Sequence, residues 1–197
     1  MNRSKFNVTE TLKELESFYQ MKNRKELELV FVNKNEEQDL YLRTDKTRLR
    51  QIFTNLLNNA YKYTDKGKIS FGYEIMDHEV KFFVSDTGIG IAVSEYDNIF
   101  NYFHKIDIGD NKLYRGAGIG LSISNKLVEL MGGEIWLDSS VGKGTSFYFT
   151  LPPDDNPEND VENNMNVVEQ QNNLSGVTVI VAEEETHNIV LNERILR

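Results

Sequence analysis

The sequence of 197 residues contains no cysteine, three prolines and one tryptophan. Without cysteine the chain has no disulfide framework, no cysteine-bound zinc and no thiol nucleophile, as is common in a reducing compartment. Any metal ion would be bound by oxygen or imidazole ligands. No apolar run approaches the roughly 18 residues of a membrane span, and the first residues lack the apolar segment of a signal peptide. We therefore expect a soluble, cytoplasmic chain that makes no membrane contact of its own.

Basic side chains are outnumbered, because 22 Lys and Arg stand against 31 Asp and Glu and give a net charge of −9. This balance argues against direct binding of nucleic acid. The acidic excess is concentrated in residues 152–175, which contain six acidic and no basic side chains and are rich in Asn and Gln. Such a composition cannot bury enough apolar surface to offset the entropy of ordering. We expect a folded domain over 1–151, an acidic flexible linker over 152–175 and the start of a second domain over 176–197.

The spacing of apolar residues predicts the elements of the first domain. Asn7 and Glu10 form a capping box before one helix, and Asp45 is placed to cap a longer helix. Strands are expected over 27–32, 39–43, 68–75, 80–84, 134–139 and 146–151. Further helices are expected through Ile99 and over 118–131. This order indicates an α+β fold, with helices on one face of a mixed β-sheet.

The long helix carries an asparagine-rich run, NLLNNAYKYT, at residues 55–64. Asn55 and Asn59 are four residues apart and share one helical face, where two amide oxygens can ligate a hard cation such as Mg²⁺. Lys62 lies within reach of a phosphate bound there. Taken alone, an asparagine-rich helix is more typical of a face turned to solvent.

Two glycine motifs follow. DTGIGI at residues 86–91 comes directly after a strand, where the Asp86 carboxylate can accept from an exocyclic amine such as adenine N6 and the glycines let the backbone approach a flat base. By itself DTGIG is also a common turn. RGAGIGL at residues 115–121 opens a helix, whose free N–H groups and positive dipole end suit phosphate. Its spacing matches neither the Rossmann nor the Walker pattern, so we expect a phosphate site of another kind.

Together these motifs resemble the ATP-binding catalytic domain of sensor histidine kinases, in the GHKL superfamily shared with gyrase-type and Hsp90-type ATPases. The matching segments are the N box at 55–64, the G1 box at 86–91, the F box at 99–103, the G2 box at 116–121 and the closing hairpin at 141–147. The resemblance covers nearly all of residues 1–151. It implies a two-layer α/β sandwich of the Bergerat type, with ATP and Mg²⁺ as cofactors.

The resemblance also implies a role for single residues. The implied metal ligands are Asn55 and Asn59. The implied catalytic residues are Asn55, Asn59, Lys62 and Arg115. The implied nucleotide contacts are Asn59, Lys62, Tyr63, Asp86, Gly88, Gly90, Lys105, Gly116, Gly118, Gly120, Leu121 and Thr145. Residues 106–117 match the family's ATP lid, although Lys105 and Arg115 are equally well described as ordinary solvated loop charges.

The residue at position 55 bears on the choice between kinase and hydrolase. The gyrase and Hsp90 branch places a Glu four residues before the metal-binding Asn, whereas here that position is Asn55, which cannot act as a general base. We therefore expect a protein-histidine kinase of a two-component phosphorelay. The alternative is a nucleotide-binding regulatory module, or a GHKL ATPase, without kinase activity.

The chain's own histidines do not fit the role of phosphoacceptor. His78 lies in HEVKFF, which lacks the Thr-Pro of an acceptor box and is expected at a hairpin tip rather than on a helix. His104 and His187 fit no better. We expect the acceptor on a histidine-bearing dimerisation domain of the same parent protein, outside this chain.

The tail resembles the first strand and helix start of a response-regulator receiver domain. VTVIVA is followed by an acidic stretch in which Glu183 and Glu184 occupy the position of the receiver's Mg²⁺-binding pair. The resemblance implies a hybrid sensor kinase, whose parent can be anchored in the inner membrane. The expected partner is a receiver domain, in cis or on a separate response regulator, and the alternative is an arbitrary amphipathic tail.

Overall fold

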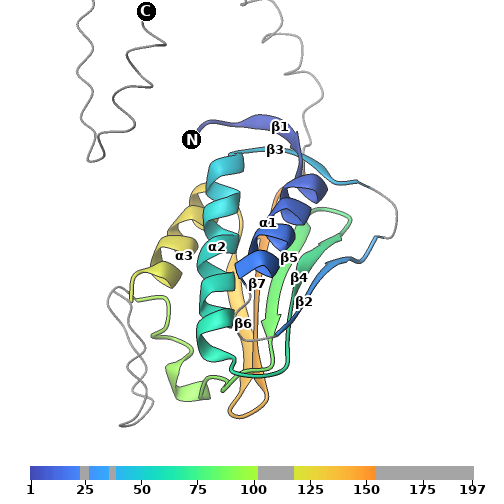
Figure 1. Cartoon of the computed structure of the whole chain (residues 1–197). Coiled ribbons are helices and arrows are strands. Elements are labelled where there is room, and N and C mark those ends of the chain that lie inside the picture. The colour runs from blue at the N-terminus through green and yellow to red at the C-terminus, as the bar shows by residue number, and fades with distance from the viewer. Residues whose placement is uncertain (23–26, 36–38, 102–117, 154–197) are drawn as a thin grey trace, which may run out of the picture. The chain divides into compact units, whose positions relative to one another are not determined.

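The computed structural model describes residues 1–22, 27–35, 39–101 and 118–153 (Figure 1). The chain divides into two compact units, Met1–Asn156 and Pro157–Arg197, and all described residues belong to the first. The predicted receiver fragment and nearly all of the predicted linker lie outside the described residues. Within the described part, no helix is both long enough and apolar enough to cross a membrane.

The described residues form seven strands, three α-helices and one short 3₁₀ turn. In chain order they are β1 (Ser4–Asn7), α1 (Val8–Lys22), β2 (Glu28–Asn33), β3 (Tyr41–Thr44), α2 (Lys46–Tyr63), β4 (Lys68–Ile75), β5 (Val80–Asp86), the 3₁₀ turn η1 (Val93–Glu95), α3 (Gly120–Leu130), β6 (Ile135–Ser140) and β7 (Gly144–Leu151).

Five strands form one mixed sheet in the order β2-β4-β5-β7-β6, and β1 pairs with β3 in a separate two-stranded sheet. The β2–β4 pair is parallel, whereas the other neighbours in the large sheet are antiparallel. The three α-helices lie over the same face of this sheet (Figure 1). The predicted two-layer α+β sandwich is therefore confirmed.

Aromatic side chains fill the space between α2 and the sheet. Phe82 of β5 stacks on Phe149 of β7 with ring centroids 4.8 Å apart. Phe53 of α2 meets both rings edge-on, at 5.8 Å and 5.4 Å. All three side chains are fully buried, and edge-to-face and offset-stacked pairs add specific geometry to the hydrophobic stabilisation. This packing fixes α2 over the centre of the sheet.

Polar side chains fix the helix starts as the sequence predicts. The Asn7 side chain accepts from the N–H of Glu10 at 3.0 Å, and Asp45 caps α2 by accepting from the N–H of Arg48 at 3.1 Å. The predicted α2 and β4 are also confirmed.

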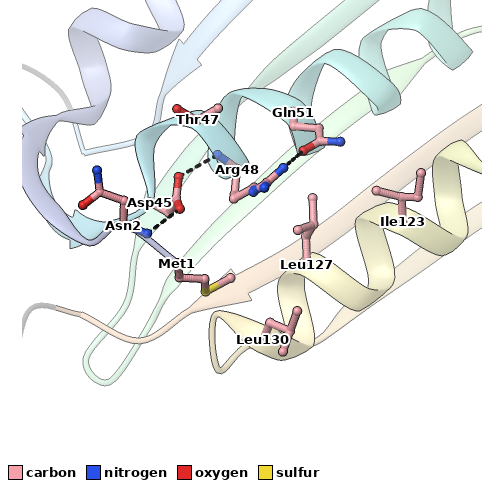
Figure 2. Close-up of a pocket in the computed structure, with 9 residues that line it drawn as sticks. All are labelled: Met1, Asn2, Asp45, Thr47, Arg48, Gln51, Ile123, Leu127 and Leu130. Carbon is pink, nitrogen blue, oxygen red and sulfur yellow. Dashed lines mark hydrogen bonds between the residues drawn. The ribbon is translucent and has the colours of Figure 1, made fainter. Parts of the chain in front are cut away.

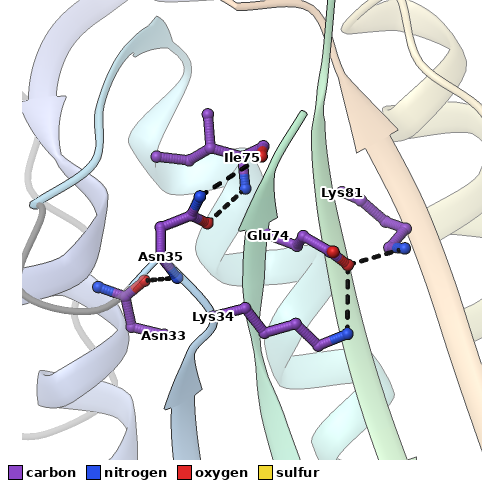
Figure 3. A network of polar contacts seen from close by, with 6 residues as sticks. All are labelled: Asn33, Lys34, Asn35, Glu74, Ile75 and Lys81. Atoms are coloured by element: carbon purple, nitrogen blue, oxygen red, sulfur yellow. Dashed lines mark hydrogen bonds and ion pairs between the residues drawn. The ribbon is translucent and has the colours of Figure 1, made fainter. Parts of the chain in front are cut away.

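A second polar network joins β2, β4 and β5 (Figure 3). The Asn35 amide bonds both main-chain groups of Ile75, at 2.7 Å and 3.4 Å, and so continues the β2–β4 ladder past the end of β2. Glu74 lies between Lys81 at 2.9 Å and Lys34 at 3.2 Å. Hydrogen bonds from these two ammonium groups lower the pKa of the Glu74 carboxyl.

Several details differ from the sequence prediction, the following three among them. The helix expected through Ile99 does not form in the described residues. Only the 3₁₀ turn η1 is present there, followed by turns in which Asn98 and Ile99 donate to the Glu95 carbonyl and Asn101 donates to the Asn98 carbonyl. The strand expected to end at Val84 continues to Asp86, because its pairing with β7 extends that far. The strand β1 was not predicted, since its four residues are defined by pairing with β3.

Candidate functional site

The second half of α2 contacts both glycine motifs. At its end, the Tyr63 carbonyl accepts from the N–H of Ile89 at 3.3 Å. In its middle, the Asn55 amide nitrogen donates to the Gly120 carbonyl at 3.1 Å, across 65 residues of sequence. Three motifs that are far apart in the chain therefore meet along one helix.

Asp86 is the partly buried acceptor of the site. It ends β5 and stands opposite Thr145 of β7 in the sheet register. Burial raises the pKa of the Asp86 carboxyl, while hydrogen bonds from the N–H groups of Gly88 and Thr145 and from the Thr64 hydroxyl act in the opposite direction. The Gly88 bond is 2.8 Å long. A carboxylate held in this way offers a fixed acceptor to an N–H donor such as an exocyclic amine.

The glycines after Asp86 are required by close contacts. A Cβ atom at Gly88 would lie 2.4 Å from the Tyr63 carbonyl oxygen, so a side chain there would push the loop away from α2. Gly90 has a φ of +72°, and a Cβ atom there would lie 2.0 Å from the Ser140 carbonyl oxygen. Both positions therefore need glycine to pack the loop against α2 and the β6–β7 hairpin. That they also line a base pocket stays a prediction.

Behind Thr145 lies a hydroxyl network that the sequence did not point to. The Thr145 hydroxyl is 2.9 Å from Ser139 Oγ, which donates to the Gly144 carbonyl and accepts from the N–H of Ile91, each at 2.8 Å. The Tyr96 hydroxyl accepts from the N–H of Ser139 at 2.8 Å. Ser139 of β6 is a polar residue on the buried face of a strand, and this was the one sequence feature that could have indicated the network.

The polar end of α2 presents the other predicted residues. Asn59, Lys62 and Tyr63 are each partly exposed. Lys62 Nζ donates to the Tyr63 hydroxyl at 2.9 Å and lies 4.6 Å from the centre of that ring. An ammonium and a phenol placed together in this way form a donor pair that suits an anionic ligand.

The start of α3 lies beside this part of α2. Gly118 has a φ of +71°, and the helix begins at Gly120, followed by Leu121. A Cβ atom at Gly120 would meet the Asn55 side chain at an ordinary 3.9 Å. The helix start therefore abuts the asparagine motif, where its free N–H groups can serve an anion.

Several predicted residues cannot be placed. Lys105, Arg115, Gly116, the rest of the 106–117 segment and His104 lie outside the described residues, as do Glu183, Glu184 and His187. His78 is exposed in the turn between β4 and β5, as predicted. Among the residues with described coordinates, no three His, Asp or Glu side chains gather as a metal cluster. A metal ion held by described residues would therefore depend on amide oxygens and on the ligand's own oxygens.

A groove lies between the start of α2 and the later turns of α3, away from the motif residues (Figure 2). It is lined by Met1, Asn2, Asp45, Thr47, Arg48, Gln51, Ile123, Leu127 and Leu130. None of these residues belongs to the three motifs, so this groove is separate from the site described above.

Residues 44–155 match the family described as histidine kinase-, DNA gyrase B-, and HSP90-like ATPase. The chain belongs to this ATPase family. The matched range includes all three motifs, from the start of α2 to the end of β7, and ATP binding follows from membership.

Two curated relatives of this ATPase family are sensor kinases. The chain is 34% identical to the sensor histidine kinase WalK of Bacillus subtilis (strain 168) over 139 residues, which are 69% of this chain and 23% of WalK. It is 33% identical to the autoinducer 2 sensor kinase/phosphatase LuxQ of Vibrio vulnificus (strain YJ016) over 189 residues, which are 93% of this chain and 22% of LuxQ. The chain thus spans less than a quarter of the length of either protein.

Solved structures of the family share the fold. The catalytic domain of histidine kinase ThkA has 31% identity and a TM-score of 0.67, over 78% of this chain and 99% of that domain. Full-length ShkA in complex with AMPPNP has 27% identity and the same TM-score, over 78% of this chain and 32% of ShkA. The described residues therefore form the catalytic domain of a histidine kinase.

Proposed function

We propose that this catalytic domain binds Mg²⁺-ATP and transfers the γ-phosphate to a histidine on a dimerisation domain outside this chain. The observation that carries the proposal is the double contact of α2, through Tyr63 with the loop after Asp86 and through Asn55 with the start of α3. A base bound at Asp86 and phosphates bound at α3 would then lie along one helix. Catalysis would rest on positioning and charge neutralisation, as is usual for phosphoryl transfer.

The adenine would bind at Asp86. The Asp86 carboxylate would accept a hydrogen bond from the exocyclic amine of adenine. Gly88, Gly90 and Thr145 would border the base. The Thr145 hydroxyl is anchored to Ser139, which supports a rigid edge on that side. Tyr63 would contact the nucleotide between base and phosphates. A carboxylate acceptor favours adenine over guanine, because guanine presents a carbonyl oxygen where adenine has its amine.

The phosphates would lie between α2 and α3. The amide oxygens of Asn55 and Asn59 fit Mg²⁺, which takes hard oxygen ligands and is commonly held by one or two protein groups together with phosphates. Bound Mg²⁺ would supply positive charge to the phosphate oxygens. Lys62 would add a further positive charge, and N–H groups at Gly118, Gly120 and Leu121 would donate to the phosphates. Lys105, Arg115 and Gly116, outside the described residues, are proposed as further phosphate contacts.

The transfer itself needs no activated water. A ring nitrogen of the acceptor histidine would form a bond to the γ-phosphorus while the bond to the bridging oxygen breaks, leaving phosphohistidine and ADP. Position 55 supports this outcome over hydrolysis. An amide there cannot remove a proton from water, and the Asn55 nitrogen already donates to Gly120.

For the remainder of the chain, we propose an acidic linker over 152–175 and the beginning of a receiver domain over 176–197, as in a hybrid kinase. The LuxQ alignment supports homology beyond the catalytic domain, because its 189 residues exceed the 151 residues of that domain. A receiver, in cis or on a separate response regulator, is the proposed partner. Histidine kinase ThkA, which is 30% identical to this chain, has been solved in complex with response regulator protein TrrA, and this supports that choice. Use of cellular ATP supports a cytoplasmic location.

A binding experiment tests the site. AMPPNP would be titrated into the chain with and without Mg²⁺, using the wild type, Asp86→Asn and Asn59→Ala. Asp86→Asn should weaken binding about tenfold in both conditions, because a charge-assisted hydrogen bond to the base is lost. Asn59→Ala should remove mainly the gain that Mg²⁺ confers. Unchanged binding in both variants would contradict the assignment.

A transfer experiment tests the activity. The chain should label an added helical domain of its parent kinase that bears the acceptor histidine when supplied with γ-labelled ATP, and should not label itself. Label on His78, His104 or His187 would overturn the proposed acceptor. Absence of transfer, with nucleotide binding intact, would favour the regulatory module without kinase activity.

A further inference from the structure

Ser124 of α3 bonds the side chain of Asn55 on the neighbouring helix. Ser124 is fully buried, with 0% of its surface exposed. The Asn55 amide nitrogen donates to Ser124 Oγ at 3.2 Å and to the Gly120 carbonyl at 3.1 Å. Ser124 Oγ in turn donates to the same carbonyl at 3.0 Å. These three groups form a closed set of hydrogen bonds between α2 and the first turn of α3.

Donor and acceptor chemistry determines which way the Asn55 amide faces. A carbonyl oxygen only accepts, so the amide atom that faces Gly120 must be the nitrogen. The Ser124 hydroxyl gives its one hydrogen to Gly120, so its oxygen accepts from the amide nitrogen. The two acceptors are only 3.0 Å apart, so both lie on the α3 side of that nitrogen. The amide oxygen of Asn55 must consequently point away from α3.

We infer that Ser124 is a positioning residue for metal-dependent nucleotide binding, acting through Asn55. This inference rests on the proposed function, in which the oxygens of Asn55 and Asn59 meet Mg²⁺ and the phosphates. Ser124 is the second of two anchors on the Asn55 nitrogen, so it limits rotation of the amide and keeps the oxygen directed to the ligand. Without it, the amide nitrogen keeps only the Gly120 carbonyl as an acceptor, and the amide has more freedom to turn.

Ser122 offers a matched control in the same helix. It is similarly buried, with 3% of its surface exposed, and its hydroxyl bonds the Ile119 carbonyl within the same turn at 2.9 Å. Ser122→Ala and Ser124→Ala remove the same group from α3. They differ in that the bond to Asn55 is lost only in the second.

The measurement is the affinity for AMPPNP with and without Mg²⁺, by calorimetry on the whole chain. The ratio of the two affinities is the metal-dependent gain. Ser124→Ala should reduce this gain about fivefold, the usual effect of one hydrogen bond, whereas Ser122→Ala should leave it unchanged. An equal gain in both variants would overturn the inference, even if both lower the unfolding temperature.

A second pair separates the hydroxyl from the volume at position 124. Threonine and valine add the same bulk to a buried site, but only threonine keeps a hydroxyl. Ser124→Thr should therefore retain more of the metal-dependent gain than Ser124→Val. Equal gains in this pair would also overturn the inference.

Asn59→Ala distinguishes the two levels of failure. If that variant keeps the full metal-dependent gain, the proposed metal site is wrong and the role of Ser124 falls with it. If Asn59→Ala removes the gain while Ser124→Ala matches the wild type, only the role of Ser124 is wrong.

Discussion

At the scale of single residues, Asp86 is partly buried, yet the proposed binding of adenine requires its carboxylate to be ionised. Burial raises its pKa, so the folded domain binds the Asp86 proton more tightly than an unfolded chain does. The stabilising effect of that proton is complete below the unfolded pKa and is lost as the pH rises through the folded pKa. Once it is ionised, the partly buried Asp86 therefore lowers the free energy of unfolding. Such a cost is common at binding sites.

The same shift predicts a pH dependence of binding. A protonated Asp86 can no longer act as a full acceptor for the adenine amine, and its raised pKa places this loss at a higher pH than for an ordinary aspartate. Nucleotide affinity should therefore fall on acidification before exposed carboxylates titrate. A fluorescent ATP analogue titrated at successive pH values would follow this. The Asp86→Asn variant keeps every ionisable group except the Asp86 carboxyl. An equally steep fall of nucleotide affinity with pH in that variant would therefore contradict the prediction.

The candidate site residues could be named from the sequence, whereas their supporting contacts could not. Asn55, Asn59 and Asp86 stand at motif positions that can be recognised by spacing. Ser124 and Ser139 were missed because each acts through a partner. Ser124 contacts Asn55, 69 residues away, through helix packing, and Ser139 contacts Thr145, six residues away, through strand register. A serine in a helix or strand carries no sign of such a partner.

At the scale of elements, the cap of α2 has a measurable contribution. Burial acts to raise the pKa of Asp45, but hydrogen bonds from the N–H groups of Asn2 and Arg48 outweigh it and the pKa is lowered. Asp45→Ala should lower the free energy of unfolding by about 1–2 kcal/mol, measured by denaturant titration at neutral pH. The difference from wild type should shrink as the pH falls through the lowered Asp45 pKa.

Asp45→Asn is the control for this cap. Asparagine is an equally good N-cap residue, so this variant should keep most of the stability. Nucleotide affinity should not change in either variant, because Asp45 begins α2 and the motif residues end it. A stability loss as large in Asp45→Asn as in Asp45→Ala would show that the side chain acts through its charge alone.

Long elements with strong local signals were predicted well. The α2 helix has a capping residue and an apolar stripe from Leu49 to Ala60. In β4, apolar residues alternate with other residues along the sequence. The prediction failed for η1, where apolar residues at helical spacing settle in a 3₁₀ turn, and for β1, a strand of four residues. In both cases contacts with distant segments outweigh the local pattern, as in the bond that the Ser139 N–H donates to the Tyr96 hydroxyl.

At the scale of the whole molecule, the chain combines a nearly neutral catalytic domain with an acidic segment. Six acidic residues fall within 152–175, so the net charge of −9 belongs largely to the segment after the domain. The catalytic domain of ThkA corresponds to 78% of this chain. A domain of that extent is therefore sufficient for this fold.

A shortened chain tests this separation. Truncation after Asn156, at the boundary of the first compact unit, should leave the unfolding temperature and the AMPPNP affinity close to those of the full chain. Differential scanning calorimetry and a nucleotide titration would measure both. The buried apolar cluster of the described residues ends at Leu151 and so remains complete. A clear fall in either quantity would mean that residues 157–197 stabilise the domain.

The strand order also has a consequence for how the domain is made. The last described strand, β7, lies between β5 and β6, so β5 has an unpaired edge until residues 144–151 are available. Pairing Asp86 with Thr145 closes a long loop, and such distant contacts slow folding. During synthesis on the ribosome, Asp86 is therefore in place long before its pairing partner. If Thr145 borders the base as proposed, we expect a nascent chain to bind nucleotide only after the final strand of the domain has emerged.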